Sequence, residues 1–186
     1  MRGNMRIITV CLLVIFICLS GASQLKAVTQ SPPSSTPKTQ LEEPHAAYVL
    51  APLEYVGQAH STIISKLGTP EKQSVEQIKN THNPAVTDYI HTVVYDGLKL
   101  TTYKVSNSGE EFLLSVEMHK SYPLVAHGLQ IGMTEEDLKK RVGSPRSEKN
   151  GTVEWSLISE VGEYAIMTVS LENGKVVKIL WAYPID

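Results

Sequence analysis

The sequence has only two cysteines among its 186 residues, Cys11 and Cys18, and both lie near its start. They fall in a stretch that we interpret as a removable leader, so the mature chain would contain no thiol. Such a chain has no disulfide, no cysteine nucleophile, no thiolate zinc site and no CxxC redox motif. Protein classes that depend on cysteine chemistry are therefore excluded.

A hydrophobic run long enough to cross a membrane is also missing. Residues 7–19 form an apolar stretch of about 13 residues, whereas a spanning helix needs roughly 20. Arg2 and Arg6 precede this stretch, and small residues from Ser20 to Ser23 follow it. A positive start, a short apolar core and small residues are typical of a signal peptide. We therefore interpret residues 1–27 as a signal peptide.

The leader leaves two destinations open. Cleavage would release a periplasmic or secreted protein, whereas lipidation of Cys18 would make it outer-membrane-associated, although Ile17 is larger than the residue that usually precedes a lipidated cysteine. Residues 28–45 are rich in Pro, Ser and Thr and poor in apolar residues, which predicts a flexible linker.

The chain has no cluster of positive charge. It contains 17 Lys and Arg against 19 Asp and Glu, for a net charge of −2, and loss of the leader would remove only basic residues. Nucleic acid and anionic lipid headgroups are therefore poor candidate partners.

Signatures of catalysis are missing as well. There is no GxSxG nucleophile motif and no glycine-rich phosphate loop. The histidines never stand four residues apart and never form a known metal-ligand pattern. We expect no enzyme activity, no catalytic residue, no cofactor and no metal. The six histidines are His45, His60, His82, His91, His119 and His127.

One stretch of the sequence occurs twice. Residues 56–70 align without a gap to residues 131–145, at an offset of 75 residues. Such an offset is long enough for a small supersecondary unit, so the alignment predicts a tandem repeat. We place repeat 1 at residues 46–119 and repeat 2 at residues 120–186. The identical positions are Gly57 and Gly132, Gly68 and Gly143, and Pro70 and Pro145.

The second copy predicts a helix over residues 135–142. Thr134 is a good N-cap, and acidic residues follow it in the first turn, where the helix dipole favours them. Three basic residues occupy the last turn, and Gly143 ends the helix. In the first copy His60 replaces the acidic residue, so we expect a weaker cap, from Ser61 or from the backbone.

The remainder of each repeat alternates like β-strands separated by turn residues such as Asp96-Gly97 and Asn173-Gly174. Residues 74–79 are compatible with a brief second helix. The pattern predicts an α+β fold of two helix–strand–strand–strand repeats, with the helices packed on one face of an antiparallel sheet. The expected strands are residues 88–95, 98–105, 111–118, 152–158, 164–172 and 175–183.

The alternation also predicts which face the helices cover. Ala165, Met167, Val169 and Leu171 lie on one uniformly apolar row, which should face the helices. The other face is partly apolar with no helix left to cover it, and is a candidate binding surface unless the repeats or a loop pack there. The candidate partner contacts, each of which core packing would also explain, are Tyr103, Tyr122, Trp155, Trp181 and Tyr183.

The motif GMTEEDLKKRVGSP, beginning at Gly132 and followed by strands, resembles the SmpA/OmlA family of small outer-membrane assembly lipoproteins. It is also similar to the wider group that shares a fold with the β-lactamase inhibitory proteins, which are built as two tandem repeats. The first resemblance implies a non-enzymatic envelope assembly or scaffold factor that binds another envelope or secreted protein, with peripheral membrane association as an option. The second implies a soluble inhibitor or immunity protein that occludes a partner enzyme.

Overall fold

The computed structural model describes residues 44–160 and 162–185. The predicted signal peptide and nearly all of the predicted linker lie outside these residues. The described helices are α1 (Ala46–Val49), α2 (Ala51–Val56), α3 (His60–Leu67) and α4 (Glu135–Val142). The strands are β1 (Lys72–Lys79), β2 (Thr87–Tyr95), β3 (Leu98–Lys104), β4 (Glu111–Met118), β5 (Ser147–Lys149), β6 (Thr152–Ser159), β7 (Gly162–Glu172) and β8 (Lys175–Ala182).

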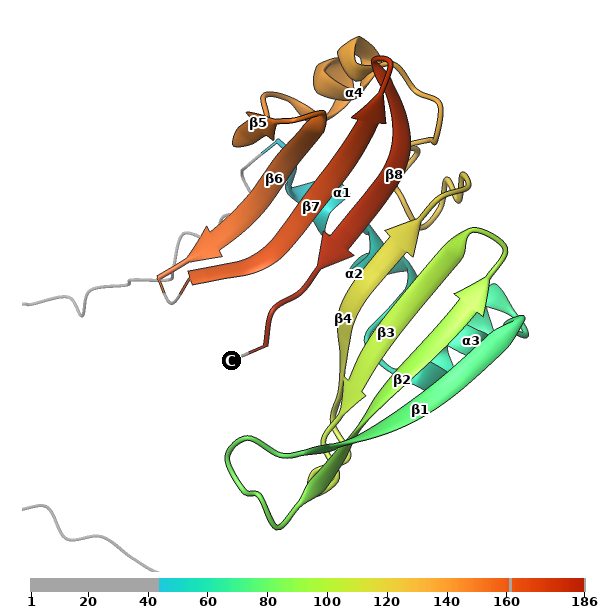
Figure 1. Ribbon diagram of the computed structural model, residues 1–186, viewed down its shortest axis with the longest axis vertical. Coiled ribbons are helices and arrows are strands. Elements are labelled where there is room, and N and C mark those ends of the chain that lie inside the picture. Colours follow the sequence, from blue (N-terminus) through green and yellow to red (C-terminus); the bar gives the residue numbers. More distant parts are fainter. Residues whose placement is uncertain (1–43, 161, 186) are drawn as a thin grey trace, which may run out of the picture. The chain divides into compact units, whose positions relative to one another are not determined.

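All eight strands belong to one antiparallel sheet in the order β1-β2-β3-β4-β8-β7-β6-β5 (Figure 1). Each half of the sheet is a meander preceded by a helix, α3 for β1–β4 and α4 for β5–β8. The halves meet at β4 and β8, where only four residue pairs join them, from Ser115 with Ala182 to Met118 with Ile179. One short ladder therefore makes a single sheet from two meanders.

The expected α+β fold of two helix–strand–strand–strand repeats is wrong. The described chain is dominated by one eight-stranded sheet, with four helices of which none exceeds eight residues. Each half has four strands rather than three, because β1 and β5 were not expected. The fold is therefore richer in β-structure than the sequence pattern indicated.

The expected brief helix at residues 74–79 is instead part of β1. Its residues are mostly polar and exposed, so hydrophobic periodicity gives no strand signal. All eight residues of β1 pair with β2, from Lys72 opposite Val94 to Lys79 opposite Thr87. Ladder hydrogen bonds to a neighbouring strand thus override a weak local preference for helix.

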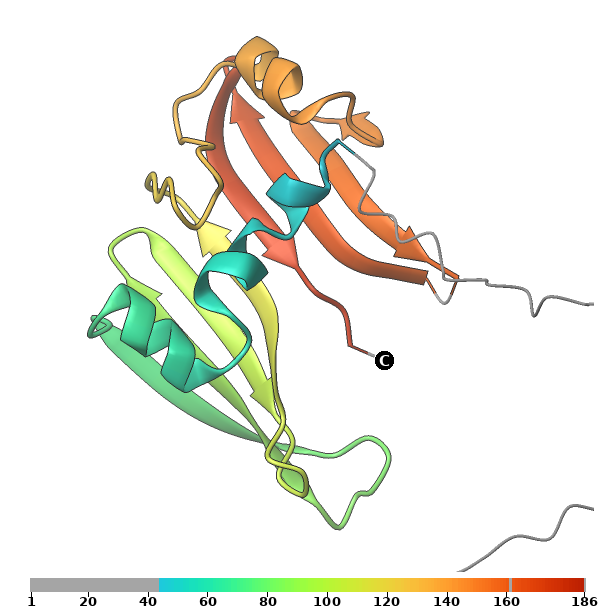
Figure 2. The ribbon, with the colours of Figure 1, turned by 180° about the vertical axis from the view of Figure 1, so that it is seen from behind.

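The helices lie on one side of the sheet (Figure 2). Trp181 Nε1 donates to the Tyr48 carbonyl of α1 at 2.9 Å, and the Tyr183 hydroxyl donates to the Val49 carbonyl at 3.0 Å. Near α4, Trp155 Nε1 donates to the Gly143 carbonyl at 3.3 Å. Ala165, Met167 and Val169 are fully buried on this side, as predicted. Leu171, the last residue of the predicted row, is only half-buried, because the register shifts between Ser170 and Leu171. The core therefore lies between the sheet and the helices.

The predicted α4 is confirmed at both ends. The helix runs from Glu135 to Val142, and Thr134 Oγ1 accepts a hydrogen bond from the Asp137 N–H at 3.1 Å. The same hydroxyl donates to Asp137 Oδ2 at 2.8 Å, which orients its oxygen to accept from the helix N–H. Local sequence is therefore sufficient to start this helix.

The cap of α3 comes from elsewhere in the chain. Neither Ala59, at the N-cap position, nor Ser61 supplies a side-chain cap. Instead the His60 N–H donates to Glu111 Oε2, on β4, at 2.6 Å. A carboxylate at this place stabilises the positive end of the helix dipole. The acidic residue missing from the first turn of α3 is thus replaced by a residue about 50 positions later in the chain.

Replacing Thr134 by alanine should lower the free energy of unfolding by about 1 kcal/mol, because the Asp137 N–H loses its acceptor. Thermal and denaturant unfolding followed by circular dichroism would measure the change. Thr134→Ser keeps the hydroxyl and should stay close to the unmodified protein. Equal losses in the two variants would show that the methyl group of Thr134, rather than the cap, carries its contribution.

Candidate functional site: the open face of the sheet

The sheet face that points away from the helices is the candidate site, and we call it the open face (Figure 1). Leu100 and Val116 point toward the helices and are fully buried. Since side chains alternate along a strand, their neighbours Thr101 and Ser115 point the other way, and both are half-buried. Cross-strand partners share a face, so the register identifies every other member of the open face.

Four hydroxyl side chains form a line across the middle of one half of the open face. Ser74 pairs with Thr92, Thr92 with Thr101, and Thr101 with Ser115, so the line crosses β1 to β4. Ala182 on β8 is the next partner, which continues the line with another short side chain. We call Ser74, Thr92, Thr101 and Ser115 the hydroxyl band. It offers donors and acceptors on a surface without long side chains.

Larger side chains border the hydroxyl band on one side. Ile90 pairs with Tyr103, and Tyr103 with Phe112, in the row next to the band. All three are half-buried rather than core residues. An apolar and aromatic row beside a band of hydroxyls has the mixed character of protein interfaces, which enrich aromatic residues among hydrogen-bonding groups.

Charged residues border the band on the other side. Lys99 pairs with Glu117, and Glu117 with Leu180, at the junction of the two halves. Glu117 Oε1 lies 2.7 Å from His119 Nε2, and this hydrogen bond holds the pKa of the Glu117 carboxyl below its usual range. Glu117 therefore stays ionised at neutral pH and supplies a fixed negative charge beside Lys99.

Tyr103 is held in place by a buried carboxylate. Its hydroxyl donates to Asp88 Oδ2 at 2.5 Å, and the Asn80 side-chain amide donates to the same oxygen at 2.6 Å. The Ser106 N–H donates to Asp88 Oδ1 at 2.9 Å. Asp88 is fully buried, and these bonds, the one from Ser106 first, lower the pKa of its carboxyl. The hydrogen bond to Asp88 likewise raises the pKa of the Tyr103 phenol.

Of the five aromatic residues expected to contact a partner, the structure brings only Tyr103 to the open face. Trp155, Trp181 and Tyr183 are buried on the helix side, where their polar atoms donate to backbone carbonyls. Tyr122 lies in the loop after β4 and donates to the Asp96 carbonyl at 2.9 Å. The three buried residues thus stabilise the core and offer no surface to a partner.

Sequence reasoning missed a contact between two histidines. The rings of His60, on α3, and His91, on β2, lie 4.8 Å apart between centroids. Burial, and next the charge on His60, lower the pKa of His91, while Glu111 acts in the opposite direction. Thr102, the cross-strand partner of His91, is buried, and its hydroxyl has no hydrogen-bond partner within the described chain. No sequence signal links residues so far apart.

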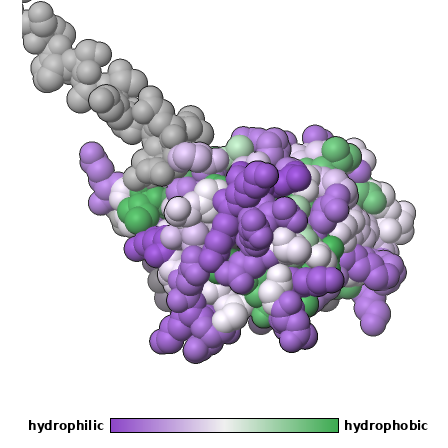
Figure 3. Space-filling model, turned by 90° about the horizontal axis from the view of Figure 1, so that it is seen from above, coloured by the Kyte–Doolittle hydropathy of each residue, from purple (hydrophilic) through white to green (hydrophobic). Residues whose placement is uncertain are grey.

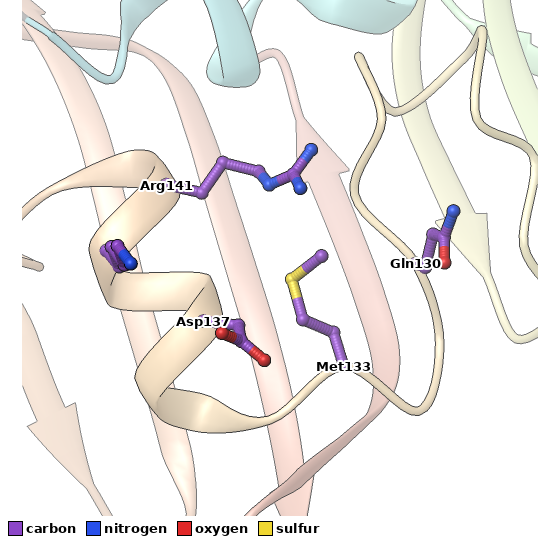
Figure 4. Close-up of a pocket in the computed structure, with 5 residues that line it drawn as sticks. Gln130, Met133, Asp137 and Arg141 are labelled. Carbon is purple, nitrogen blue, oxygen red and sulfur yellow. The ribbon is translucent and has the colours of Figure 1, made fainter.

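A surface hollow beside α4 is a second candidate site. Gln130, Met133, Asp137 and Arg141 line it, together with Lys140 (Figure 4). It is open to solvent, and the end of the fold that carries α4 is largely hydrophilic, with small scattered apolar areas (Figure 3). Binding pockets for small molecules are usually concave and mostly apolar. The hollow lacks that character, so we favour the open face.

The choice of the open face as the candidate site rests on its geometry alone. No protein-family model, curated protein or solved structure matches this chain. Within residues 44–160 and 162–185, no group of three or more His, Cys, Asp or Glu is placed to hold a metal. No helix in the described part of the chain is long and apolar enough to cross a membrane.

The Asp88 contacts should support the fold at neutral pH and lose their effect in acid. Since the pKa is lowered on folding, the contribution is complete above the unfolded value of about 4. It should decline as the pH falls from there toward the folded pKa. The difference in unfolding free energy between the unmodified protein and Asp88→Asn, measured from pH 7 to pH 2, should therefore shrink below pH 4. A constant difference would show that charge on Asp88 does not matter.

His91 should make the fold sensitive to mild acid. Its pKa is lowered on folding, so unfolding takes up a proton below the unfolded value of about 6.5. Stability should be full above that pH and fall as the pH drops through it. His91→Gln should flatten this part of the stability profile, with His60, Lys104 and Glu111 left in place. His82→Gln, in an exposed loop, is the matched control and should keep the unmodified profile.

Proposed function

We propose that this protein is a non-enzymatic protein–protein interaction module of the cell envelope, an assembly or scaffold factor that binds another envelope or secreted protein through its open face. The observation that carries the proposal is the hydroxyl band between an apolar aromatic row and a charged row, on a sheet face free of helices. Polar, apolar and charged groups on one exposed surface together match the composition of protein interfaces.

The geometry suits a macromolecular partner better than a small one. The hydroxyl band crosses four strands, and neighbouring strands lie about 4.8 Å apart, so it extends over roughly 15 Å. A protein partner can cover such a surface, whereas a small molecule needs an enclosing cavity. Tyr103 is pre-oriented by Asp88, so binding would immobilise little additional conformational freedom there.

The predicted leader supplies the location in this proposal. Export followed by cleavage would place the protein in the periplasm or outside the cell, and lipidation of Cys18 would hold it at the outer membrane. The linker before α1 would then separate the folded part from the membrane. These steps concern residues outside the described part of the chain, and they rest on the sequence features alone.

A site-specific substitution tests the open face directly. Thr101→Arg puts a long charged side chain in the middle of the hydroxyl band, where it should block docking. Thr101 is half-buried on the open face, so the arginine can extend into solvent and the fold should remain intact. We expect affinity capture from solubilised envelope to recover a partner with the unmodified protein and to lose it with this variant.

Ser65→Arg provides the matched control, because it adds the same side chain to the exposed surface of α3, on the opposite side of the sheet. This variant should retain the partner. If both variants retain it, the open face is not the binding surface. If the captured protein is a soluble enzyme whose activity is lost on binding, the protein is an inhibitor rather than an assembly factor.

A further inference from the structure

Helix α3 is attached to the fold less firmly than its counterpart α4. Ile63 is its one fully buried residue, whereas α4 buries both Leu138 and Val142. The first turn of α3 has no acidic residue and no side-chain cap of its own, so this end of the helix depends on Glu111 from β4. Figure 2 shows α3 lying across the strands of its half on the helix side of the sheet.

Ionisable side chains gather where α3 begins. The His60 N–H donates to Glu111 Oε2 at 2.6 Å, and Glu111 Oε1 lies 3.3 Å from Lys104 Nζ. The rings of His60 and His91 lie 4.8 Å apart between centroids. Three side chains that can carry positive charge therefore lie near one carboxylate, at the positive end of the helix dipole.

The strands around His91 supply no second carboxylate within the described chain. Val75 on β1 and Thr102 on β3 are the cross-strand partners of His91, and the Tyr89 ring lies 6.4 Å from its ring. The Thr102 hydroxyl has no hydrogen-bond partner in this part of the chain, so it does not hold the ring. The charges that act on the ring are those of His60, Glu111 and Lys104.

Mild acid changes the balance of charge at this end of α3. Histidine ordinarily gains its proton between pH 8 and pH 5, whereas glutamate and lysine ordinarily keep their charges over that range. Burial, and next the charge of His60, lower the pKa of His91, so its protonation favours a state in which the ring is better solvated. Two cationic rings repel each other, and positive charge at His60 opposes the helix dipole. Glu111 attracts both rings, but Lys104 and the His60 N–H already engage it.

We propose that α3 is an acid-sensitive latch, which lies on the sheet at neutral pH and detaches below about pH 6 while the rest of the sheet stays folded. Detachment would expose apolar residues of the helix side such as Val93, which is fully buried at neutral pH. Release of α3 alone is distinct from unfolding of the whole chain. The latch does not depend on the proposed partner, because α3 lies on the opposite side of the sheet from the open face.

Hydrogen exchange measured by mass spectrometry, on protein purified after expression of the full chain, tests the latch at about pH 7.5 and about pH 5. After correction for the intrinsic pH dependence of exchange, the amides of residues 60–67 should lose protection about fivefold or more at the lower pH. The amides of α4, residues 135–142, should keep their protection and serve as an internal control.

The double variant His60→Gln with His91→Gln should retain a protected α3 at both pH values. It keeps the backbone N–H of residue 60, which is the group bonded to Glu111, so the helix cap is preserved. His82→Gln with His119→Gln is the matched control, because it replaces two exposed histidines outside the contact of His60 with His91. This control should lose protection in α3 at the lower pH, as the unmodified protein does.

Equal protection of α3 at both pH values in the unmodified protein overturns the proposal. So does a loss that α3 and α4 share, because the whole chain would then be unfolding. A loss confined to α3 that persists in the double glutamine variant assigns the effect to other groups and overturns it as well. A double variant whose α3 is unprotected at both pH values would show that the rings hold the helix by packing, which also contradicts the latch.

Discussion

The junction of β4 with β8 is the constraint on which the rest of the fold depends. Four residue pairs join the two meanders there, and on the helix side Val116, Met118, Ile179 and Trp181 are fully buried. The indole of Trp181 also holds α1 through the Tyr48 carbonyl. A four-stranded meander with one short helix has little apolar surface to bury. The buried residues of both halves accordingly form one continuous core on the helix side of the sheet.

A one-sided core has a direct consequence for the opposite face. All the packing elements lie on the helix side, so each strand can vary its outward residues without disturbing the core. Outward positions such as Thr101 and Ser115 carry short hydroxyl side chains. Strand propensity alone does not explain this choice, because β-branched apolar residues would suit a strand equally well. Tyr103 is the one predicted contact residue that lies on the open face. Its hydroxyl is held by the buried Asp88 carboxylate. Most residues of the open face are thus free of core packing, while Tyr103 is held in one orientation.

The sequence predicted those elements whose signal is local. The turns Asp96-Gly97 and Asn173-Gly174 close two hairpins. Asn173 and Gly174 both have positive φ, as a type I′ turn requires, whereas at Asp96-Gly97 only the glycine does. The six predicted strands appear within a few residues of their expected bounds. β1 and β5 were missed because neither has an apolar row, and only their neighbours make them strands.

The candidate site could be predicted as a face but not as a set of residues. Alternation in β8 is ambiguous, because Ile179 and Leu180 are both apolar and neither row is clearly polar. Trp181 and Tyr183 were therefore compatible with either face. Their burial depends on the carbonyls of α1, a helix without a sequence signal of its own. The contact of His60 with His91 depends equally on packing between distant elements.

The two halves of the sheet differ in how far local sequence determines them. α4 is capped by its own Thr134, whereas α3 takes its cap from Glu111 on β4. The half containing α3 also carries the polar edge strand β1, the hydroxyl band and the buried Thr102 hydroxyl without a partner in the described chain. Natural proteins depart from locally consistent sequence mainly where function requires it. These departures gather in β1–β4 and α3, the half that carries the proposed binding surface, whereas α4 is capped by its own N-cap residue.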